Sequence, residues 1–468
     1  MEKENVVVEK ERRHVVVVVL GDIGRSPRMQ YHALSVLQHG HNVSLVGYYS
    51  GDGLFPDLKV YHDDDQDDPT NSSSQRQNSL CIIPLNPFID PRRHRPTQKP
   101  LLPFYFIARA LSLFCSLFWG LLQCRKDVHV VLVQNPPSIP TLLVAYLYTR
   151  FKNAKFMIDW HNLGFSMLEN KHLQSLVRLY ERVMAPTADA HFCVTHAMKA
   201  WLKQHFHIHA HTLYDGPPHF FRPIESQEMK ESTLKELIQK YPSQLQNFQI
   251  DNKEQQTKSL PKFIISSTSW TPDEDFGILL DALCLLDPKL TLLDDNHPHT
   301  RLVVVVTGKG PQKEYYQNKI KDLSLQNIEI STIWLDAQDY PKLLACADLG
   351  VSLHTSTSKL DLPMKIWDML GCAIPVCAVH YDCLKEELFS KEARGHTFTN
   401  HQILSQQIYD LLFSKSTNCE NDQISKMKLA LTSTAKPDRW STNWDTYAKP
   451  IILSTLSTKK LVKGKKDD

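Results

Sequence analysis

The chain contains 468 residues, of which 42% are hydrophobic and 22% are charged, with a formal net charge of +2. This composition excludes a disordered or fibrous chain, and the near-neutral balance gives no general attraction to nucleic acid. The length predicts two domains of similar size, because single hydrophobic cores stop growing at about 250–300 residues.

The first half of the chain alternates predicted strands with predicted helices. Residues 14–20, HVVVVVL, predict a strand buried on both faces of a parallel sheet. Strand-and-turn patterns return at 128–135, 154–162 and 188–196. This order predicts an α/β fold with a doubly wound sheet.

Between these strands lies an apolar stretch at 101–124, LLPFYFIARALSLFCSLFWGLLQC, interrupted only by Arg109. About 20 apolar residues are enough to span a bilayer. The strands on either side are expected to pair in one sheet, however, and a single crossing would separate them. We therefore predict a helix that lies against or dips into the membrane, with Arg109 and the flanking RRHRPTQK near the head groups. A buried core helix is the alternative.

The polar and acidic residues 61–79 predict a solvated loop. The second half repeats the alternation of strands and helices. The sequence thus predicts an N-terminal Rossmann-like domain at 1–225, a linker at 226–260 where hydrophobic content falls, and a C-terminal Rossmann-like domain at 261–435. A C-terminal helix and basic tail follow at 436–468. Two such domains facing across a cleft place sites at the carboxyl ends of strands.

A glycine turn after the first strand carries Gly21, Gly24, Arg25 and Arg28. Glycines let a ligand approach the backbone, while helix N-terminal amides and arginines favour an anion. The third glycine of a dinucleotide fingerprint is missing, so we predict a phosphate contact. A plain tight turn with surface arginines is the alternative.

Two strand ends of the second half show similar chemistry. Residues 303–311, VVVVTGKGP, place Lys309 between Gly308 and Gly310, which fits a diphosphate. The segment SSTSW at 266–270 ends another strand with small hydroxyl residues, including Thr268, where a ligand can approach.

In the first half, IDWHN at 158–162 ends a strand with Asp159, His161 and Asn162. A histidine beside a carboxylate can act as a general base near neutral pH. A hydrogen-bonded structural histidine is the alternative.

The stretch DLPMKIWDMLGC at 361–372 spaces Asp361, Lys365 and Asp368 on one helix face. Asp361 is predicted as the N-cap, with Pro363 in the first turn. Lys365 then offers charge to a phosphate and Asp368 a hydrogen-bond acceptor to a sugar diol. The alternative is a capped helix with an exposed ion pair between Asp361 and Lys365, worth about 0.3–0.5 kcal/mol.

From about residue 14 to about residue 455, the sequence resembles the chitobiosyldiphosphodolichol β-mannosyltransferases. The segments that carry the resemblance are VVVLGDIGRSPRMQYHALS, LVQNPPSIP, IDWHN, FCVTHAM, SSTSWTPDEDF, VTGKGPQKEYY, ADLGVSLHTSTSKLDLPMK and DMLGCAIPVCAV. The resemblance implies a GT-B fold and an early step of lipid-linked oligosaccharide synthesis for protein N-glycosylation. In that step, mannose passes from GDP-mannose in β1,4 linkage to dolichol-diphosphate-linked chitobiose, at the cytosolic face of the endoplasmic reticulum.

The resemblance also implies roles for residues. The turn from Gly21 to Arg28 would face the acceptor diphosphate, and Lys309, Lys365 and Asp368 would hold the donor. Glu274 stands near a place where the wider superfamily often has a lysine, which leaves Lys309 or Lys365 to supply the charge. Further donor-binding candidates are Thr268, Gly308, Gly310 and Asp361.

A β product from an α-linked donor requires inversion, and inversion requires a base on the acceptor hydroxyl. His161 is the first candidate base and Asp159 the second.

The expected partners are GDP-mannose, the dolichol-linked acceptor, the endoplasmic reticulum membrane and other dolichol-pathway mannosyltransferases, with no nucleic acid. No tightly bound cofactor and no metal ligand set are expected, while stimulation by a divalent metal stays an alternative. The ten cysteines are scattered and no signal peptide precedes the first strand, so free thiols in a reducing cytosol are expected. The C-terminal KKDD has the dilysine pattern of retrieval to the endoplasmic reticulum.

Two other functions fit the same sequence. One is a transferase of the same fold that uses a UDP-sugar and another acceptor. The other is a catalytically silent paralogue that acts as a partner in a glycosyltransferase assembly.

Overall fold

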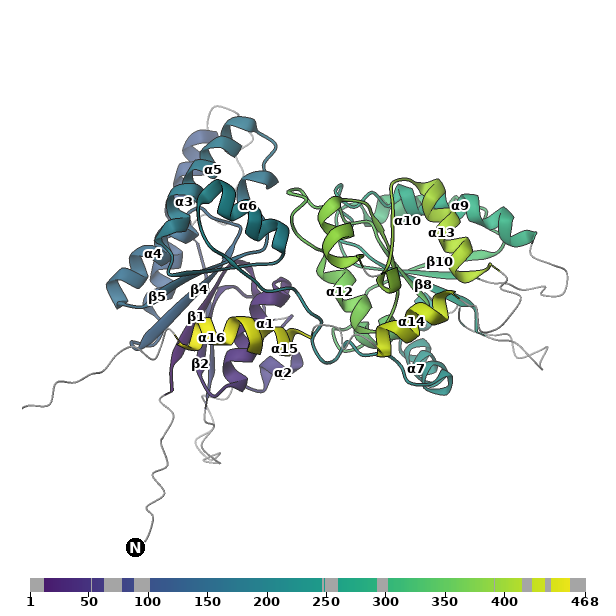
Figure 1. Cartoon of the computed structure of the whole chain (residues 1–468), viewed down its shortest axis with the longest axis horizontal. Coiled ribbons are helices and arrows are strands. Elements are labelled where there is room, and N and C mark those ends of the chain that lie inside the picture. Colours follow the sequence, from purple (N-terminus) through teal and green to yellow (C-terminus); the bar gives the residue numbers. More distant parts are fainter. Residues whose placement is uncertain are drawn as a thin grey trace, which may run out of the picture. The chain divides into compact units, whose positions relative to one another are not determined.

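The computed structural model describes residues 12–51, 53–62, 78–87, 102–245, 248, 260–292, 302–390, 392–414, 423–433 and 439–454. The chain divides into two units, residues 1–213 with 443–468 and residues 214–442. Figure 1 colours them along the sequence. Three predicted features lie outside the described residues: most of the acidic loop (63–77), the basic segment RRHRPTQK (92–99) and the terminal KKDD (465–468).

The first unit is built on a parallel sheet whose seven described strands run in the order β3-β2-β1-β4-β5-β6-β7. Their bounds are β1 (His14–Asp22), β2 (Asn42–Tyr48), β3 (Leu80–Pro84), β4 (Val128–Asn135), β5 (Lys155–Trp160), β6 (Ala190–Cys193) and β7 (His211–Thr212). β1 lies in the interior of the sheet, and Val15 to Val19 are at most 1% exposed. The prediction of a strand covered on both faces is confirmed.

Helices cover both faces of this sheet. They are α1 (Pro27–Gln38), α2 (Pro56–Lys59), α3 (Leu102–Leu122), α4 (Thr141–Lys152), α5 (Lys171–Met184) and α6 (His196–Phe206). The strand order reverses between β3 and β4, and crossovers between parallel strands are right-handed. Consequently α1 lies on one face of the sheet, while α3, α4 and α5 lie on the other (Figure 1).

The predicted apolar helix at 101–124 is α3. Its inner side packs on the sheet through buried leucines, and a Cβ on Gly120 would come within 2.8 Å of Leu85. The strands β1 and β4 pair in parallel, as expected for two strands of one sheet. Among the described helices, one segment, Tyr105–Leu122, is long and apolar enough to cross a membrane. Only 28% of this segment is buried, so the alternative of a buried core helix does not describe its outer side. Its contact with a membrane stays a prediction.

The second unit contains a parallel sheet of six described strands in the order β10-β9-β8-β11-β12-β13. The strands are β8 (Lys262–Ser267), β9 (Leu302–Thr307), β10 (Ile328–Ile333), β11 (Leu349–Ser352), β12 (Val376–Val379) and β13 (Gly395–Phe398). Its helices include α9 (Gly277–Thr291), α10 (Lys313–Lys321), α11 (Tyr340–Ala345), α12 (Met364–Gly371), α13 (His401–Leu412) and α14 (Gln423–Ser433). No cysteine in the described ranges forms a disulfide.

The domain boundaries differ from the prediction in two places. The second unit begins at Tyr214, and the predicted linker at 226–260 contains α7 (Gln227–Lys240) and α8 (Pro242–Leu245) of that unit. The amphipathic α7 buries only Leu234 and Leu237, which explains the low hydrophobic content of this stretch.

The C-terminal residues also belong to a different unit than predicted. After α15 (Trp440–Asn443), the π-helical turn η9 (Trp444–Ala448) and α16 (Lys449–Ser454) belong to the first unit rather than to a separate tail. Asp445 pairs with His39 at 2.9 Å, so this segment is fastened to the end of α1.

Candidate active site

A fully buried carboxylate, Asp159, lies near the carboxyl end of β5. The Arg28 guanidinium donates to it twice, from Nε at 2.7 Å and from Nη2 at 2.8 Å. Burial opposes the charged form of Asp159, but Arg28 and the neighbouring histidines hold its pKa well below the ordinary value. The side chain is therefore an ionised carboxylate at neutral pH.

This pairing corrects two predicted roles. Arg28 is 1% exposed, and its Nη1 also donates to the Leu213 carbonyl at 2.8 Å, so it braces the interior and does not face a diphosphate. Asp159 was the second candidate base. The low pKa of Asp159 and its buried partners do not suit proton removal from an alcohol. The adjacent His161, which is partly exposed, keeps its place as the first candidate base.

Two histidines flank the carboxylate. His161 Nε2 lies 3.0 Å and His32 Nε2 lies 3.2 Å from the same oxygen, Asp159 Oδ2. The indole Nε1 of Trp444 is 3.1 Å from His32 Nδ1. Because an indole nitrogen can only donate, His32 Nδ1 accepts and its Nε2 carries the proton toward Asp159. Burial lowers the pKa of His32, which keeps this ring neutral.

The same reasoning fixes the tautomer of His161. Asp159 accepts from Arg28 and His32, and an ionised carboxylate has only acceptor positions. His161 therefore directs an Nε2–H toward Asp159, which leaves Nδ1 as the ring atom that can take a proton. The His161 side chain is 21% exposed, unlike the buried Asp159 and His32. An oriented, partly exposed imidazole is what a general base requires.

The glycine turn after β1 is held by Asp22, whose Oδ1 accepts from the Gly24 amide at 2.9 Å. Arg25 follows with a side chain that is 85% exposed, and its Nε is 3.7 Å from Asp22. A Cβ on Gly21 would meet only Val19, at 3.8 Å, so space alone does not require that glycine. Of the two predicted arginines, Arg25 is the one positioned to meet an anion from solvent.

In the second unit, polar groups converge on Glu274, which is 2% exposed. Lys365 Nζ lies 2.6 Å from its Oε1, and Thr268 Oγ1 donates to its Oε2 at 2.5 Å. The backbone amide of Ser269 donates to the same Oε2. Burial opposes ionisation, but His354 and Lys365 lower the pKa of Glu274 to about 2. Lys365 therefore pairs with Glu274, and not with Asp361 as in the alternative of an exposed ion pair within the helix.

His354 joins this cluster from the carboxyl end of β11. Its Nδ1 is 3.7 Å from Glu274 Oε1, and its Nε2 is 3.8 Å from Asp361 Oδ2. His354 is not among the residues that the sequence predicts for the site. The available signal was its position directly after a buried strand, in SLHTS, where the other candidates also lie.

Asp361 is not the cap of α12. The helix begins at Met364, and Pro363 occupies the N-cap position. Asp361 instead accepts hydrogen bonds from the hydroxyls of Ser356 and Ser358 and stabilises the loop before the helix.

Asp368 lies one turn after Lys365 on α12, and its side chain is half-buried. Burial and the nearby Asp215 raise the pKa of Asp368 well above its ordinary value. The carboxyl group therefore holds its proton more readily than a surface aspartate, and it can donate as well as accept a hydrogen bond. Its predicted contact with a ribose stays a prediction.

The glycine turn after β9 packs tightly on the loop after β8. A Cβ on Gly308, whose φ is +147°, would come within 1.8 Å of the Thr268 carbonyl oxygen, and one on Gly310 within 1.7 Å of the Ser269 oxygen. Only glycine fits at these two points. Lys309, between them, is exposed and lies 4.2 Å from the centre of the Trp334 ring.

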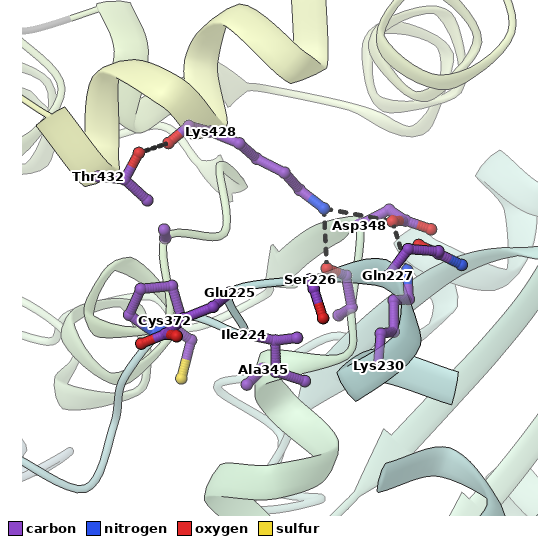
Figure 2. Close-up of a pocket in the computed structure, with 13 residues that line it drawn as sticks. Ile224, Glu225, Ser226, Gln227, Lys230, Ala345, Asp348, Cys372, Lys428 and Thr432 are labelled. Atoms are coloured by element: carbon purple, nitrogen blue, oxygen red, sulfur yellow. Dashed lines mark hydrogen bonds and ion pairs between the residues drawn. The ribbon is translucent and has the colours of Figure 1, made fainter. Parts of the chain in front are cut away.

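A separate pocket of about 260 Å³ lies elsewhere in this unit (Figure 2). Lys230 and Lys428 both pair with Asp348 there, at 2.8 and 3.2 Å. Asp348 directly precedes β11, whereas His354 follows that strand. The pocket therefore lies at the amino end of β11, and the Glu274 cluster lies at its carboxyl end. It contains none of the predicted site residues. The described residues contain no group of three or more His, Cys, Asp or Glu that could hold a metal ion.

Each unit is thus a parallel α/β sheet with charged and hydroxyl side chains gathered at the carboxyl ends of its strands. This architecture is that of a glycosyltransferase with the GT-B fold. Among solved structures, a glycosyltransferase from Rickettsia africae aligns with a TM-score of 0.61 and 15% identity, over 96% of this chain and 100% of that one. HepE from Anabaena, in complex with UDP and glucose, aligns with a TM-score of 0.59 and 15% identity, over 95% and 99% of the two chains.

Sequence relatives define the family. A protein named chitobiosyldiphosphodolichol beta-mannosyltransferase from Dictyostelium discoideum is 36% identical over 95% of this chain and 94% of its own length. The human protein of that name is 35% identical over 95% and 93%. UDP-glycosyltransferase TURAN from Arabidopsis thaliana is 37% identical over 96% and 98%. No model of a protein family matches the chain. The chain belongs to the chitobiosyldiphosphodolichol β-mannosyltransferase family.

Proposed function

We propose that the chain transfers mannose from GDP-mannose, with inversion, in β1,4 linkage to chitobiose carried on dolichol diphosphate. The acceptor follows from the name that the Dictyostelium and human relatives share. The observation that carries the chemistry is the His161 imidazole, 3.0 Å from the buried Asp159 carboxylate. An inverting transfer needs one base, and this pair supplies it.

In the proposed reaction, Nδ1 of His161 accepts the proton of the attacking acceptor hydroxyl. The acceptor oxygen forms a bond to the anomeric carbon of mannose from the face opposite the leaving group. The bond from that carbon to the diphosphate oxygen breaks, and GDP leaves with the electron pair. Asp159 stabilises the imidazolium formed on His161, and Arg28 keeps Asp159 ionised throughout.

The donor diphosphate is proposed to bind in the second unit. Lys365 has three N–H donors, of which Glu274 and Ser269 engage two, at 2.6 and 3.2 Å. Lys309 adds an exposed charge on the glycine turn after β9, where backbone amides also favour anions. These groups offset the charge that develops on the leaving diphosphate.

We further propose that the enzyme acts at the endoplasmic reticulum membrane, with both units in the cytosol. A dolichol-linked acceptor is held in a bilayer by its lipid, so the enzyme must meet it there. The apolar segment Tyr105–Leu122 of α3 supports this placement.

A UDP-sugar donor is the second candidate, because one relative is named a UDP-glycosyltransferase and a fold neighbour is a complex with UDP. The deciding experiment offers GDP-mannose or UDP-sugars, with a chitobiosyl-diphosphate lipid, to the purified protein and follows product mass. A gain of one hexose from GDP-mannose alone, released by β-mannosidase, is expected. Transfer from a UDP-sugar alone would replace GDP-mannose in the proposal, and failure to bind or use any donor would reject it. A parallel series with added divalent cation or chelator tests metal stimulation.

A further inference from the structure

Three neighbouring helices of the first unit each present an apolar stripe to solvent. The stripe of α3 includes Trp119, which is 67% exposed, that of α4 ends at Phe151, which is 72% exposed, and that of α5 ends at Val183, which is 61% exposed. The exposed large apolar side chains on these helices are Phe106, Ile107, Leu111, Trp119 and Leu122 on α3, Leu143, Leu147 and Phe151 on α4, and Leu173, Leu176, Leu179 and Val183 on α5. Spacings of three or four residues dominate within each set, so each set lies along one side of its helix.

These exposed apolar side chains are not needed for the hydrophobic core of the unit. Each helix already buries its opposite side, for example through Leu117 on α3, Tyr148 on α4 and Met184 on α5. The helices lie on the same face of the sheet (Figure 1). The Leu143 amide of α4 donates to the Tyr180 hydroxyl of α5 at 3.1 Å, and α3 packs against α4. The stripes therefore belong to one continuous face, which we call the apolar face.

The charged residues on these helices are mostly basic. They carry six basic residues, Arg109, Arg150, Lys152, Lys171, Arg178 and Arg182, and one acidic residue. The acidic residue, Glu181, is buried and accepts from the Asn135 side chain at 3.1 Å and the Gly164 amide at 3.0 Å. Arg150 is partly offset by Asp189, at 3.3 Å. Leucine, tryptophan and phenylalanine beside a basic margin suit a membrane with anionic head groups.

We propose that the apolar face of α3, α4 and α5 is a docking surface for an anionic lipid bilayer. The apolar side chains enter the boundary between head groups and acyl chains, and the basic side chains contact lipid phosphates. The occupant is a bilayer because basic side chains outnumber acidic ones on these helices, which matches a negative surface, and because the apolar area extends over three helices. This inference identifies the surface by which the enzyme would contact the membrane. It rests on the proposed function in one respect: the docking surface would bring the enzyme to a lipid-linked acceptor.

The test measures binding of the full chain to protein-free vesicles of phosphatidylcholine, with or without phosphatidylinositol, by flotation. The double variant Leu176→Glu, Leu179→Glu changes α5 alone and leaves α3 intact. We expect its vesicle partition to fall about tenfold or more, because two apolar anchors become anionic. The matched control, Leu285→Glu with Leu429→Glu, alters exposed leucines of the second unit and should bind like the parent.

A second variant separates docking from folding. Lys171→Gln with Arg182→Gln keeps every apolar side chain and should lose about tenfold or more of its binding to anionic vesicles, with little change on neutral ones. Parent-like binding by both α5 variants would overturn the proposal. So would equal loss in the control, or binding only to native membranes that contain protein, which would indicate a protein partner.

Transfer to a short-chain, water-soluble acceptor distinguishes this proposal from the proposed function. The α5 variants should keep that activity while losing vesicle binding. Absence of transfer by the parent, with vesicle binding intact, would reject the proposed reaction and leave the docking surface standing.

Discussion

His354 gives a prediction whose size follows from the structure, because its ring lies between the carboxylates of Glu274 and Asp361, at 3.7 and 3.8 Å. Burial opposes its charged form, but the two carboxylates raise the pKa of His354 from 6.5 to about 9. The imidazolium is therefore the expected form at neutral pH. A charged His354 adds to Lys365 in balancing Glu274, Asp361 and an incoming diphosphate.

The effect on stability has a definite direction. The folded-state pKa is above the unfolded value, so the contribution of His354 is fully present below about pH 6.5 and is lost as pH rises through about 9. A shift of this size corresponds to about 3 kcal/mol at about 1.4 kcal/mol per pKa unit. Because the side chain is 26% exposed, water screens the ion pairs, and we expect about 1–2 kcal/mol.

The assay is an NMR titration of ring-labelled histidine, with the His354 signal assigned by its loss in His354→Gln. A midpoint near pH 9 is expected in the parent, and Glu274→Gln should move it down by at least about one unit, since one of two facing carboxylates is removed. GDP affinity should weaken over the same pH range. A parent midpoint near 6.5, or one that Glu274→Gln leaves unchanged, would refute this account of the cluster.

Three further predictions concern single positions. Asp159→Asn leaves the buried Arg28 without its carboxylate, so denaturant unfolding should show a loss of about 3–5 kcal/mol in the free energy of unfolding of the first unit. Mannose transfer should nearly vanish in the folded fraction. A stable, active variant would contradict the proposed roles of Asp159 beside Arg28 and His161. Trp444→Phe removes the indole N–H that donates to His32 Nδ1 and should lower the free energy of unfolding by about 1–3 kcal/mol, with kcat within severalfold of the parent. Parent-like thermal unfolding would argue against that hydrogen bond. Gly310→Ala places a methyl group against a carbonyl oxygen and should lower donor affinity at least tenfold in a GDP-binding assay. Gly21→Ala in the first unit, where a Cβ would meet only Val19 at 3.8 Å, is the control for a tolerated site. Unchanged GDP binding in Gly310→Ala would show that the turn does not position the donor.

Much of the fold could be predicted because its signals are local. The valine run of β1 predicts a strand covered on both faces, and the structure has one. The turns after β1, β5 and β9 lie at the carboxyl ends of parallel strands, as expected. The chain length and the repeated alternation of strands and helices predicted two such units, and the resemblance to a family implied the GT-B fold. The boundaries were less accurate because α7 is amphipathic with a narrow buried side and reads as polar linker sequence.

The partners of charged side chains could not be predicted because they come from distant parts of the chain. Arg28 and Asp159 are 131 residues apart, and the glycine turn near Arg28 suggested an anion in solution rather than a buried carboxylate. Lys365 was four residues from Asp361 and yet pairs with Glu274, 91 residues away. Helix periodicity identifies which residues share a face, but it does not identify what packs against that face.

The hydrogen bond between Trp444 and His32 has a consequence for how the protein is made. A ribosome completes all seven described strands of the first unit by residue 212, yet the segment that finishes this unit emerges more than two hundred residues later. During that interval the nascent chain holds an unfinished N-terminal unit while the second unit is being synthesised. Any chain terminated before Trp444 lacks this closing segment, so a late stop codon damages the part of the protein that was translated first.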